Sequence, residues 1–228
     1  MKNLNLQAID YPSVSGTIAA QIRNNILGGT LQPAQALSES EIAKQLGVSR
    51  GPVREALQRL VQEGLLVRIP NRGVFVTDIT SEDIAEIYEA RQTLEARCGE
   101  KVLAAADDVL DRTVRDLQAI VDEIGPAERS GRWREVVELD LRFHSTLVAA
   151  SGNSRIQRAY STLIAESSLS INRLERWYPS EDSLLQEHQA IVHALAARDA
   201  TAFTRALDLH YLQTLTEKTA ISRPSGVV

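Results

Sequence analysis

Residues 37–65 read LSESEIAKQLGVSRGPVREALQRLVQEGL, and this stretch decides the fold of the first part of the chain. Ser38 is a typical N-cap residue, and the apolar positions after it predict a short helix that ends at Gly47. The Ser49 side chain is expected to cap a further helix with Pro52 in its first turn, where the missing N–H breaks no hydrogen bond. Two helices separated by so short a turn predict a helix-turn-helix.

Elements on both sides of this stretch complete a winged helix-turn-helix. A four-residue spacing of isoleucines predicts a helix over 14–27 that two glycines terminate (Ile18, Ile22, Ile26, Gly28 and Gly29). Two short β-rich runs, 65–69 and 73–77, flank a turn and predict a hairpin, which forms the wing. We therefore expect residues 1–77 to form a winged helix-turn-helix domain.

After Thr77 the sequence predicts helices and no further strands. We expect about six, separated by turn and capping residues at Gly125-Pro126, Ser151-Gly152-Asn153 and Pro179-Ser180. Their approximate ranges are 81–106, 108–124, 132–151, 154–177, 181–198 and 199–219. The predicted fold class is mainly α, with an all-helical bundle over residues 78–228.

The composition excludes a membrane role and gives no sign of export. Hydrophobic residues make up 43% and charged residues 24% of the chain, and no apolar run approaches the ~18 residues that cross a bilayer. The N-terminus lacks an apolar segment of secretory type, and the single cysteine, Cys98, cannot form an intramolecular disulfide. We expect a cytoplasmic protein.

Charge is divided unevenly along the chain. The net charge is −5, yet residues 1–77 hold eight Lys and Arg against five Asp and Glu, a net charge of +3. Residues 78–228 therefore hold seventeen Lys and Arg against twenty-five Asp and Glu, a net charge of −8. Because phosphate attracts the basic part and repels the acidic part, nucleic-acid contact is expected from the first domain alone.

In a helix-turn-helix, the N-terminal end of the second helix enters the major groove. Arg50 and Arg54 lie in that end, four residues apart on one helix face, and an arginine fork can bind guanine or phosphate. Arg72 lies at the tip of the wing, within reach of the minor groove. We expect Ser49, Arg50, Arg54 and Arg72 to contact double-stranded operator DNA. The alternative is an amphipathic helix with two solvated arginines, kept as an interaction module.

Three histidines and one aspartate of the helical part fall where helical periodicity predicts core. Asp140 and His144 lie one turn apart on an inward stripe, and His188 and His210 lie on the inward stripes of two later helices. His193 is expected to face solvent. Such polar groups are costly to bury unless they are paired or bind a metal.

One carboxylate and three neutral imidazoles suit a divalent transition metal such as Zn²⁺, Ni²⁺ or Mn²⁺, with positions left for water or a ligand. The alternative is three unrelated core histidines, each hydrogen-bonded locally. We expect the metal site, because an Asp and a His one turn apart are joined by two further inward histidines.

Arg91 also lies on an apolar stripe, and two roles are open for it. It can bind the carboxylate of an effector in the same cavity, or it can form a buried ion pair with Glu95, one turn away. Ser167 and Ser170 are further candidates for the cavity wall, although hydroxyls within helices usually bond to their own backbone.

The first domain resembles the DNA-binding domain of the GntR family. Members of that family typically read LSE..LA..LGVSR.PVREAL..L..EGL and then a wing that ends G.FV; this chain matches over about residues 14–77, with NRGVFV in the wing. The resemblance implies that Arg50 and Arg54 contact operator bases or phosphates and that Arg72 lies near the minor groove. Ser40 and Gly51 stand where relatives often have an arginine and a threonine that contact DNA, so the operator or the affinity is expected to differ.

The helical part resembles the FCD effector domain of the FadR-like branch of the same family. The matching segments are EIYEARQTLEARC, LDLRFHSTLVAASGN and EHQAIVHALAARD, within about residues 80–215. The resemblance implies that a metal is held by Asp140, His144, His188 and His210. It further implies that the effector is a small carboxylic acid that binds directly to the metal ion. Relatives that respond to fatty acyl-CoA lack these four metal ligands.

These observations predict a ligand-responsive transcriptional regulator, a repressor by comparison with the resembled family, that binds a palindromic operator as a homodimer. One alternative is a metal-dependent hydrolase with a DNA-binding appendage, but no extra Asp or Glu lies at motif spacing to act as general base. Another alternative is a DNA-binding adaptor without an effector. We expect the protein not to be an enzyme.

Overall fold

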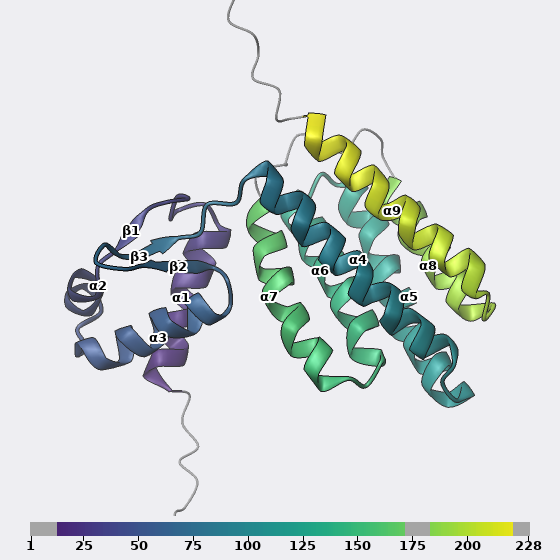
Figure 1. Cartoon of the computed structure of the whole chain (residues 1–228), viewed down its shortest axis with the longest axis horizontal. Helices are drawn as coiled ribbons and strands as arrows, with labels where there is room; N and C mark the ends of the chain where they lie inside the picture. Colours follow the sequence, from purple (N-terminus) through teal and green to yellow (C-terminus); the bar gives the residue numbers. More distant parts are fainter. Residues whose placement is uncertain (1–12, 172–182, 221–228) are drawn as a thin grey trace, which may run out of the picture. The chain divides into compact units, whose positions relative to one another are not determined.

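The computed structural model describes residues 13–171 and 183–220 of the chain. The chain divides into two compact units, with the boundary between Thr77 and Asp78. Helices dominate the described residues, and the one sheet lies in the first unit (Figure 1). Among the described residues, no helix is both long and apolar enough to cross a membrane.

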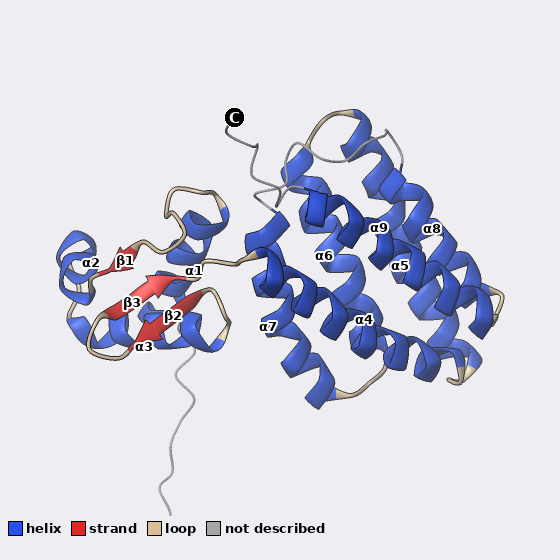
Figure 2. Ribbon diagram, turned by 45° about the horizontal axis from the view of Figure 1, so that its top comes forward, coloured by secondary structure: helices blue, strands red, loops and turns tan. Residues whose placement is uncertain are grey.

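The first unit is a winged helix-turn-helix, as predicted. Its strands form an antiparallel sheet in the order β1-β3-β2, in which Leu66 of β2 pairs with Val76 of β3 (Figure 2). Its elements are α1 (Val14–Leu27), β1 (Ala36–Leu37), α2 (Glu39–Leu46), α3 (Arg50–Gln62), β2 (Leu66–Ile69) and β3 (Gly73–Val76).

The helix-turn-helix forms where its capping residues predict it. The Ser38 hydroxyl accepts the Glu41 N–H at 3.4 Å, and Gly47 ends α2 in the left-handed conformation that glycine tolerates best. Ser49 occupies the N-cap position of α3, but the prediction that its side chain caps the helix is wrong, because it makes no capping hydrogen bond. Strand β1, which pairs Ala36 with Phe75, was not predicted.

The second unit is an all-helical bundle of six helices within the described residues, as predicted. Helix α5 packs along α6 and α8, and α4 lies between α7 and α9 (Figure 1). The helices are α4 (Ser81–Leu103), α5 (Asp107–Arg129), α6 (Trp133–Ala150), α7 (Ser154–Ile171), α8 (Ser183–Ala196) and α9 (Ala200–Ala220). The predicted helical residues 172–177 and 181–182, and the predicted break at Pro179-Ser180, lie outside the described residues.

Helix α5 does not end at Gly125-Pro126, and this part of the prediction was wrong. Proline removes one intrahelical hydrogen bond and costs about 3 kcal/mol in a helix interior. Ile124, Gly125 and Ala127 are nevertheless buried in the bundle, where a Cβ at position 125 would lie 3.0 Å from the Leu185 side chain. Burial against the neighbouring helices therefore outweighs the local penalty, and α5 continues to Arg129.

Candidate functional site

The structure brings four polar side chains of α6, α8 and α9 into one buried cluster. Asp140 and His144 project from α6, His188 from α8 and His210 from α9, and one ligand atom of each lies within 4.8 Å of the others. The His144 and His210 Nε2 atoms are 3.0 Å apart. Asp140 Oδ1 lies 3.5 Å from His144 Nε2 and 3.4 Å from His188 Nε2. We call these four residues the Asp-His cluster; His193, by contrast, is exposed, as predicted.

The second nitrogen of each imidazole in the Asp-His cluster has an acceptor outside it. His144 Nδ1 lies 2.6 Å from Glu95 Oε2, His188 Nδ1 lies 2.9 Å from the Leu184 carbonyl, and His210 Nδ1 lies 2.7 Å from Glu187 Oε2. Carboxylate and carbonyl oxygens accept hydrogen bonds, so each Nδ1 carries the proton. In the neutral form of each imidazole, Nε2 then turns a lone pair toward the centre, which is the tautomer a metal requires.

The centre of the Asp-His cluster fits a cation. His188 Nε2 is buried and has no hydrogen-bond partner, and burying a polar atom without a partner costs about 1–3 kcal/mol. The lone pairs of His144 and His210 oppose each other across 3.0 Å when both protons lie on Nδ1. A positive ion among these atoms satisfies all three nitrogens together, and one carboxylate with three imidazoles is a donor set typical of transition metals.

The charges around the Asp-His cluster favour an ionised Asp140 and a neutral His210, whereas the carboxylates of Glu95 and Asp140 outweigh burial and raise the pKa of His144. Burial alone would raise the pKa of Asp140, but the neighbouring His144 and His188 hold the pKa of this carboxyl well below its ordinary value. Burial, together with the nearby His188 and His144, lowers the pKa of His210 well below that of a free imidazole. Near neutral pH the cluster therefore holds an ionised carboxylate and a neutral His210.

A second buried layer lies behind His144 and is organised by Glu95. The Glu95 carboxylate accepts hydrogen bonds from the Tyr160 and Tyr211 hydroxyls, and Arg91 Nε lies 3.7 Å from its Oε1. Burial alone would raise the pKa of Glu95, but His144 and Arg91 lower it below the ordinary value, so the carboxylate is ionised. The sequence did not reveal the two tyrosines as partners, because each is more than sixty residues from Glu95.

Arg91 is almost fully buried and already has partners in this layer. Its Nε donates to the Tyr160 hydroxyl at 3.2 Å, and its Nη1 donates to Ser167 Oγ at 3.1 Å. Of the two roles left open by the sequence, the ion pair with Glu95 is present in the structure. Effector binding by Arg91 stays a prediction. The Ser167 hydroxyl also donates to the Leu163 carbonyl of the same helix. The side chain of Ser170 is not among those that the structure describes.

The residues predicted to contact DNA lie on the surface of the first unit. Ser49, Arg50 and Arg54 are exposed at the start of α3, and Arg54 Nε pairs with Glu39 Oε2 of α2 at 3.1 Å. Arg72 is exposed in the β2–β3 turn, with its guanidinium 5.7 Å from the centre of the Phe75 ring. The recognition helix and the wing thus both present arginine to solvent.

Comparison with known protein families finds a match for each of the two units. Residues 14–76 match the family described as bacterial regulatory proteins, gntR family, and residues 86–213 match the FCD domain. The chain belongs to the GntR family and carries an FCD domain. The Asp-His cluster lies within the matched FCD region.

Relatives of this GntR-family chain are transcriptional regulators. It is 29% identical to the gluconate operon transcriptional repressor of Bacillus subtilis, over 85% of this chain and 80% of that protein. It is 30% identical to the Nta operon transcriptional regulator of Aminobacter aminovorans, over 81% of this chain and 86% of that protein. A GntR transcriptional regulator from Rhodococcus sp. RHA1 has a similar structure, with a TM-score of 0.76, 30% identity and coverage of 92% of this chain and 99% of that one. The protein is thus a transcriptional regulator, and the hydrolase alternative is set aside.

Proposed function

We propose that this regulator is a metal-dependent, metabolite-responsive repressor whose FCD domain holds one divalent transition metal in the Asp-His cluster. The observation that carries the proposal is the convergence of four buried donors around the unpartnered His188 Nε2. Asp140, His144, His188 and His210 would hold the ion, and Glu95, Leu184 and Glu187 would orient the imidazoles. Zn²⁺, Ni²⁺ and Mn²⁺ all accept this donor set.

The effector is a small carboxylic acid. A bound metal supplies a Lewis-acid position for a carboxylate, because four protein donors leave two positions open in a six-coordinate ion. Arg91 is the only arginine or lysine buried among the described residues, and it is the proposed second partner of the effector carboxylate. The repressor relative named for the gluconate operon fits this class, since gluconate is a hydroxy acid.

Operator DNA is contacted by the first unit, residues 1–77, through Ser49, Arg50, Arg54 and Arg72. The second unit, residues 78–228, binds the effector and forms a homodimer in the cytoplasm. A dimer places two recognition helices on the half-sites of a palindromic operator. Effector binding releases the operator by favouring a conformation of the dimer with lower DNA affinity.

Operator affinity measured by fluorescence anisotropy tests this function. The metal-loaded protein is titrated onto the upstream region of its own gene, alone and with each member of a panel of small carboxylic and hydroxy acids. We expect at least one acid to weaken binding by about 5- to 150-fold, the range typical of allosteric coupling. His188→Ala is expected to keep DNA binding and lose the response, while His193→Ala keeps both. DNA binding that no acid alters would support the adaptor without an effector.

A further inference from the structure

A carboxylate on α2 holds one arginine of α3, the recognition helix. Arg54 lies in the second turn of α3, and its Nε donates to Glu39 Oε2 at 3.1 Å. Glu39 is the first residue of α2, so this ion pair joins the two helices of the helix-turn-helix. Only Nε makes this hydrogen bond, and the two terminal nitrogens of Arg54, Nη1 and Nη2, have no partner within the described part of the chain.

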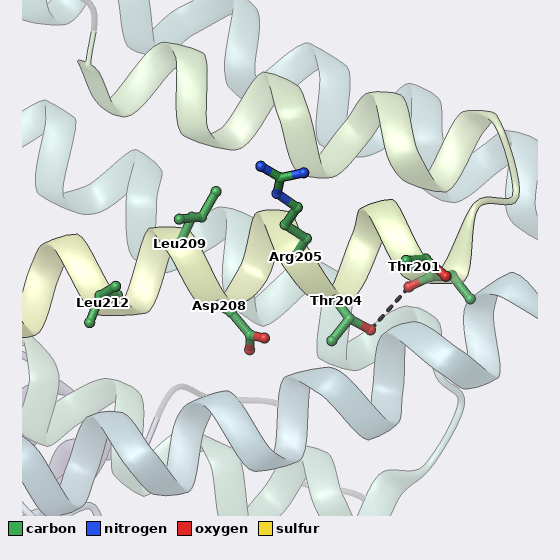
Figure 3. A pocket seen from close by; sticks show the side chains of 7 residues that line it. Thr201, Thr204, Arg205, Asp208, Leu209 and Leu212 are labelled. Carbon is green, nitrogen blue, oxygen red and sulfur yellow. Dashed lines mark hydrogen bonds between the residues drawn. The ribbon is translucent and has the colours of Figure 1, made fainter.

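The two partners of this ion pair differ in exposure. The Arg54 side chain is 58% exposed and the Glu39 side chain 26% exposed, so the guanidinium is the outer partner. Exposed arginines of this chain do not all have such a partner. Arg50, one turn earlier on α3, and Arg205, beside a shallow depression on α9 (Figure 3), form no ion pair or hydrogen bond with any residue that the structure describes. The contact of Arg54 therefore depends on the position of Glu39.

Stability alone does not account for a carboxylate at this position. An ion pair between exposed side chains adds little to the stability of a fold, because water and salt screen the two charges. A carboxylate at a DNA-binding surface also has a cost, because phosphate repels it. Residues 1–77 hold only five Asp and Glu, and Glu39 lies against an arginine near the start of the recognition helix. We therefore looked to DNA recognition for its role.

We propose that Glu39 is a positioning residue for operator recognition, which holds Arg54 so that Nη1 and Nη2 bind O6 and N7 of a single guanine. The inference rests on the operator contact of α3 in the proposed function and assigns the kind of contact that Arg54 makes. Arg54 thus reads a base, and Glu39 acts through it without touching the DNA.

The outer edge of the Arg54 guanidinium has the geometry of a guanine contact. Two parallel N–H groups of an arginine match O6 and N7 of guanine, the one base that presents two adjacent acceptors in the major groove. Because Glu39 occupies Nε, the edge left for such a contact is the one formed by Nη1 and Nη2. An arginine that is already held also loses less freedom on binding, which strengthens the contact by about 2- to 10-fold.

The charge of Glu39 favours a base over a phosphate as the partner of Arg54. The ion pair is neutral as a whole, so the attraction between Arg54 and the DNA backbone is weaker than that of a free arginine. The N–H groups of Arg54 can still bond to the neutral acceptors of guanine, since such a bond does not depend on net charge. Arg50 has no carboxylate partner within the described part of the chain and keeps its full attraction to phosphate.

Operator duplexes in which single guanines are replaced by 7-deazaguanine test this contact, because that base lacks the N7 acceptor and still pairs with cytosine. The duplex is the stretch of the gene's own upstream region that the protein protects from nuclease digestion, and fluorescence anisotropy measures the affinity. At one guanine of a half-site, the replacement is expected to weaken binding of the wild type by about 2- to 10-fold. Arg54→Ala is expected to bind more weakly and to be insensitive to the replacement at that guanine.

Glu39→Gln tests the positioning role through the specificity ratio, the affinity for the operator duplex divided by that for a duplex of scrambled sequence. The variant is expected to lower this ratio by about 2- to 10-fold and to be less sensitive to 7-deazaguanine. Its affinity for the scrambled duplex is expected to stay equal or rise, because a negative charge has been removed. Glu41→Gln, the matched control in the same first turn of α2, is expected to keep the wild-type ratio.

The outcomes that overturn the inference are distinct from those that refute the proposed function. A wild-type ratio in Glu39→Gln overturns the role of Glu39, and so does an equal loss of affinity for both duplexes, which indicates a structural effect. If Arg54→Ala stays as sensitive to every guanine as the wild type and lowers the salt slope by about one, Arg54 binds phosphate and the inference is wrong. A wild type that does not distinguish the upstream region from the scrambled duplex instead refutes operator binding, and this role with it.

Discussion

Glu95 Oε2 lies 2.6 Å from His144 Nδ1, and this hydrogen bond joins α4 to the Asp-His cluster. Glu95 lies on α4, which follows the wing in the sequence after residues 77–80, while His144 lies on α6. The carboxylate also accepts hydrogen bonds from the hydroxyls of Tyr160 on α7 and Tyr211 on α9, so it connects two further helices. The Asp-His cluster is thus linked by a direct hydrogen bond to α4, the first helix after the wing in the sequence.

Glu95→Gln is expected to lower the metal affinity of the Asp-His cluster by about 10- to 100-fold. A neutral amide holds the Nδ1 proton of His144 less strongly than a carboxylate, so the imidazole becomes a weaker ligand. Competition with a chromophoric chelator measures the affinity. Glu100→Gln, an exposed change on the same helix, is the control, and equal affinity in the two variants would contradict the role given to Glu95.

Arg91→Met is expected to lower the free energy of unfolding of the metal-free protein by about 3–5 kcal/mol, because it removes the buried guanidinium that pairs with the Glu95 carboxylate. Adding Glu95→Gln to the same chain is expected to recover part of this loss, since the uncompensated charge is then removed. Urea denaturation of the two single variants and the double variant measures the coupling. If the losses in the free energy of unfolding of the two single variants add up to that of the double variant, Arg91 and Glu95 do not stabilise the fold as an ion pair.

Asp83 caps the start of α4 and predicts a pH dependence of stability. Its Oδ2 accepts hydrogen bonds from the Thr80 N–H and hydroxyl, each at 2.7 Å, and these bonds lower the pKa of Asp83. Because the folded pKa lies below the unfolded one, the ionised carboxylate stabilises the fold above about pH 4, and this contribution is lost as the pH falls through the folded pKa. Asp83→Asn is therefore expected to lower the Tm by a few degrees at pH 7 and by progressively less in acid. Thermal scans measure the difference in Tm between Asp83→Asn and the wild type at each pH. A difference that is the same at every pH would exclude ionisation of Asp83 as its cause.

Arg50→Ala and Arg54→Ala are each expected to weaken operator binding by about 1–3 kcal/mol if they contact bases, and to reduce its salt dependence if they contact phosphates. Arg59→Ala is the matched control, because Arg59 is 60% exposed on the same helix and pairs with Glu63. Anisotropy titrations at several salt concentrations separate the two kinds of contact. An effect of Arg59→Ala as large as the others would argue against specific contacts at the start of α3.

Local patterns were sufficient to predict the winged helix-turn-helix and the members of the Asp-His cluster. Asp140 and His144 share a helix face because of the 3.6-residue period, and the stripes around His188 and His210 are apolar enough to mark both residues as inward. That the helices bring all four together is a property of the tertiary packing. The resemblance to the FCD domain predicted that step.

Features that depend on packing between distant residues could not be predicted in this way. The partners of Glu95 lie on α6, α7 and α9, and no local spacing connects them with it. Helix α5 passes Pro126 because its flanking residues are buried, which the sequence around Gly125 does not reveal. Strand β1 has two residues, too few for an alternating pattern, and forms because β3 offers a free edge.

Metal content tests the central claim most directly. The protein purified without added metal is measured by inductively coupled plasma mass spectrometry beside the variants H144A/H188A and His193→Ala. We predict about one transition-metal ion per chain in the wild type and in His193→Ala, and almost none in H144A/H188A. Wild-type protein that stays metal-free, even after incubation with Zn²⁺, Ni²⁺ and Mn²⁺, would contradict the metal-dependent sensor and reduce these histidines to hydrogen-bonded core residues.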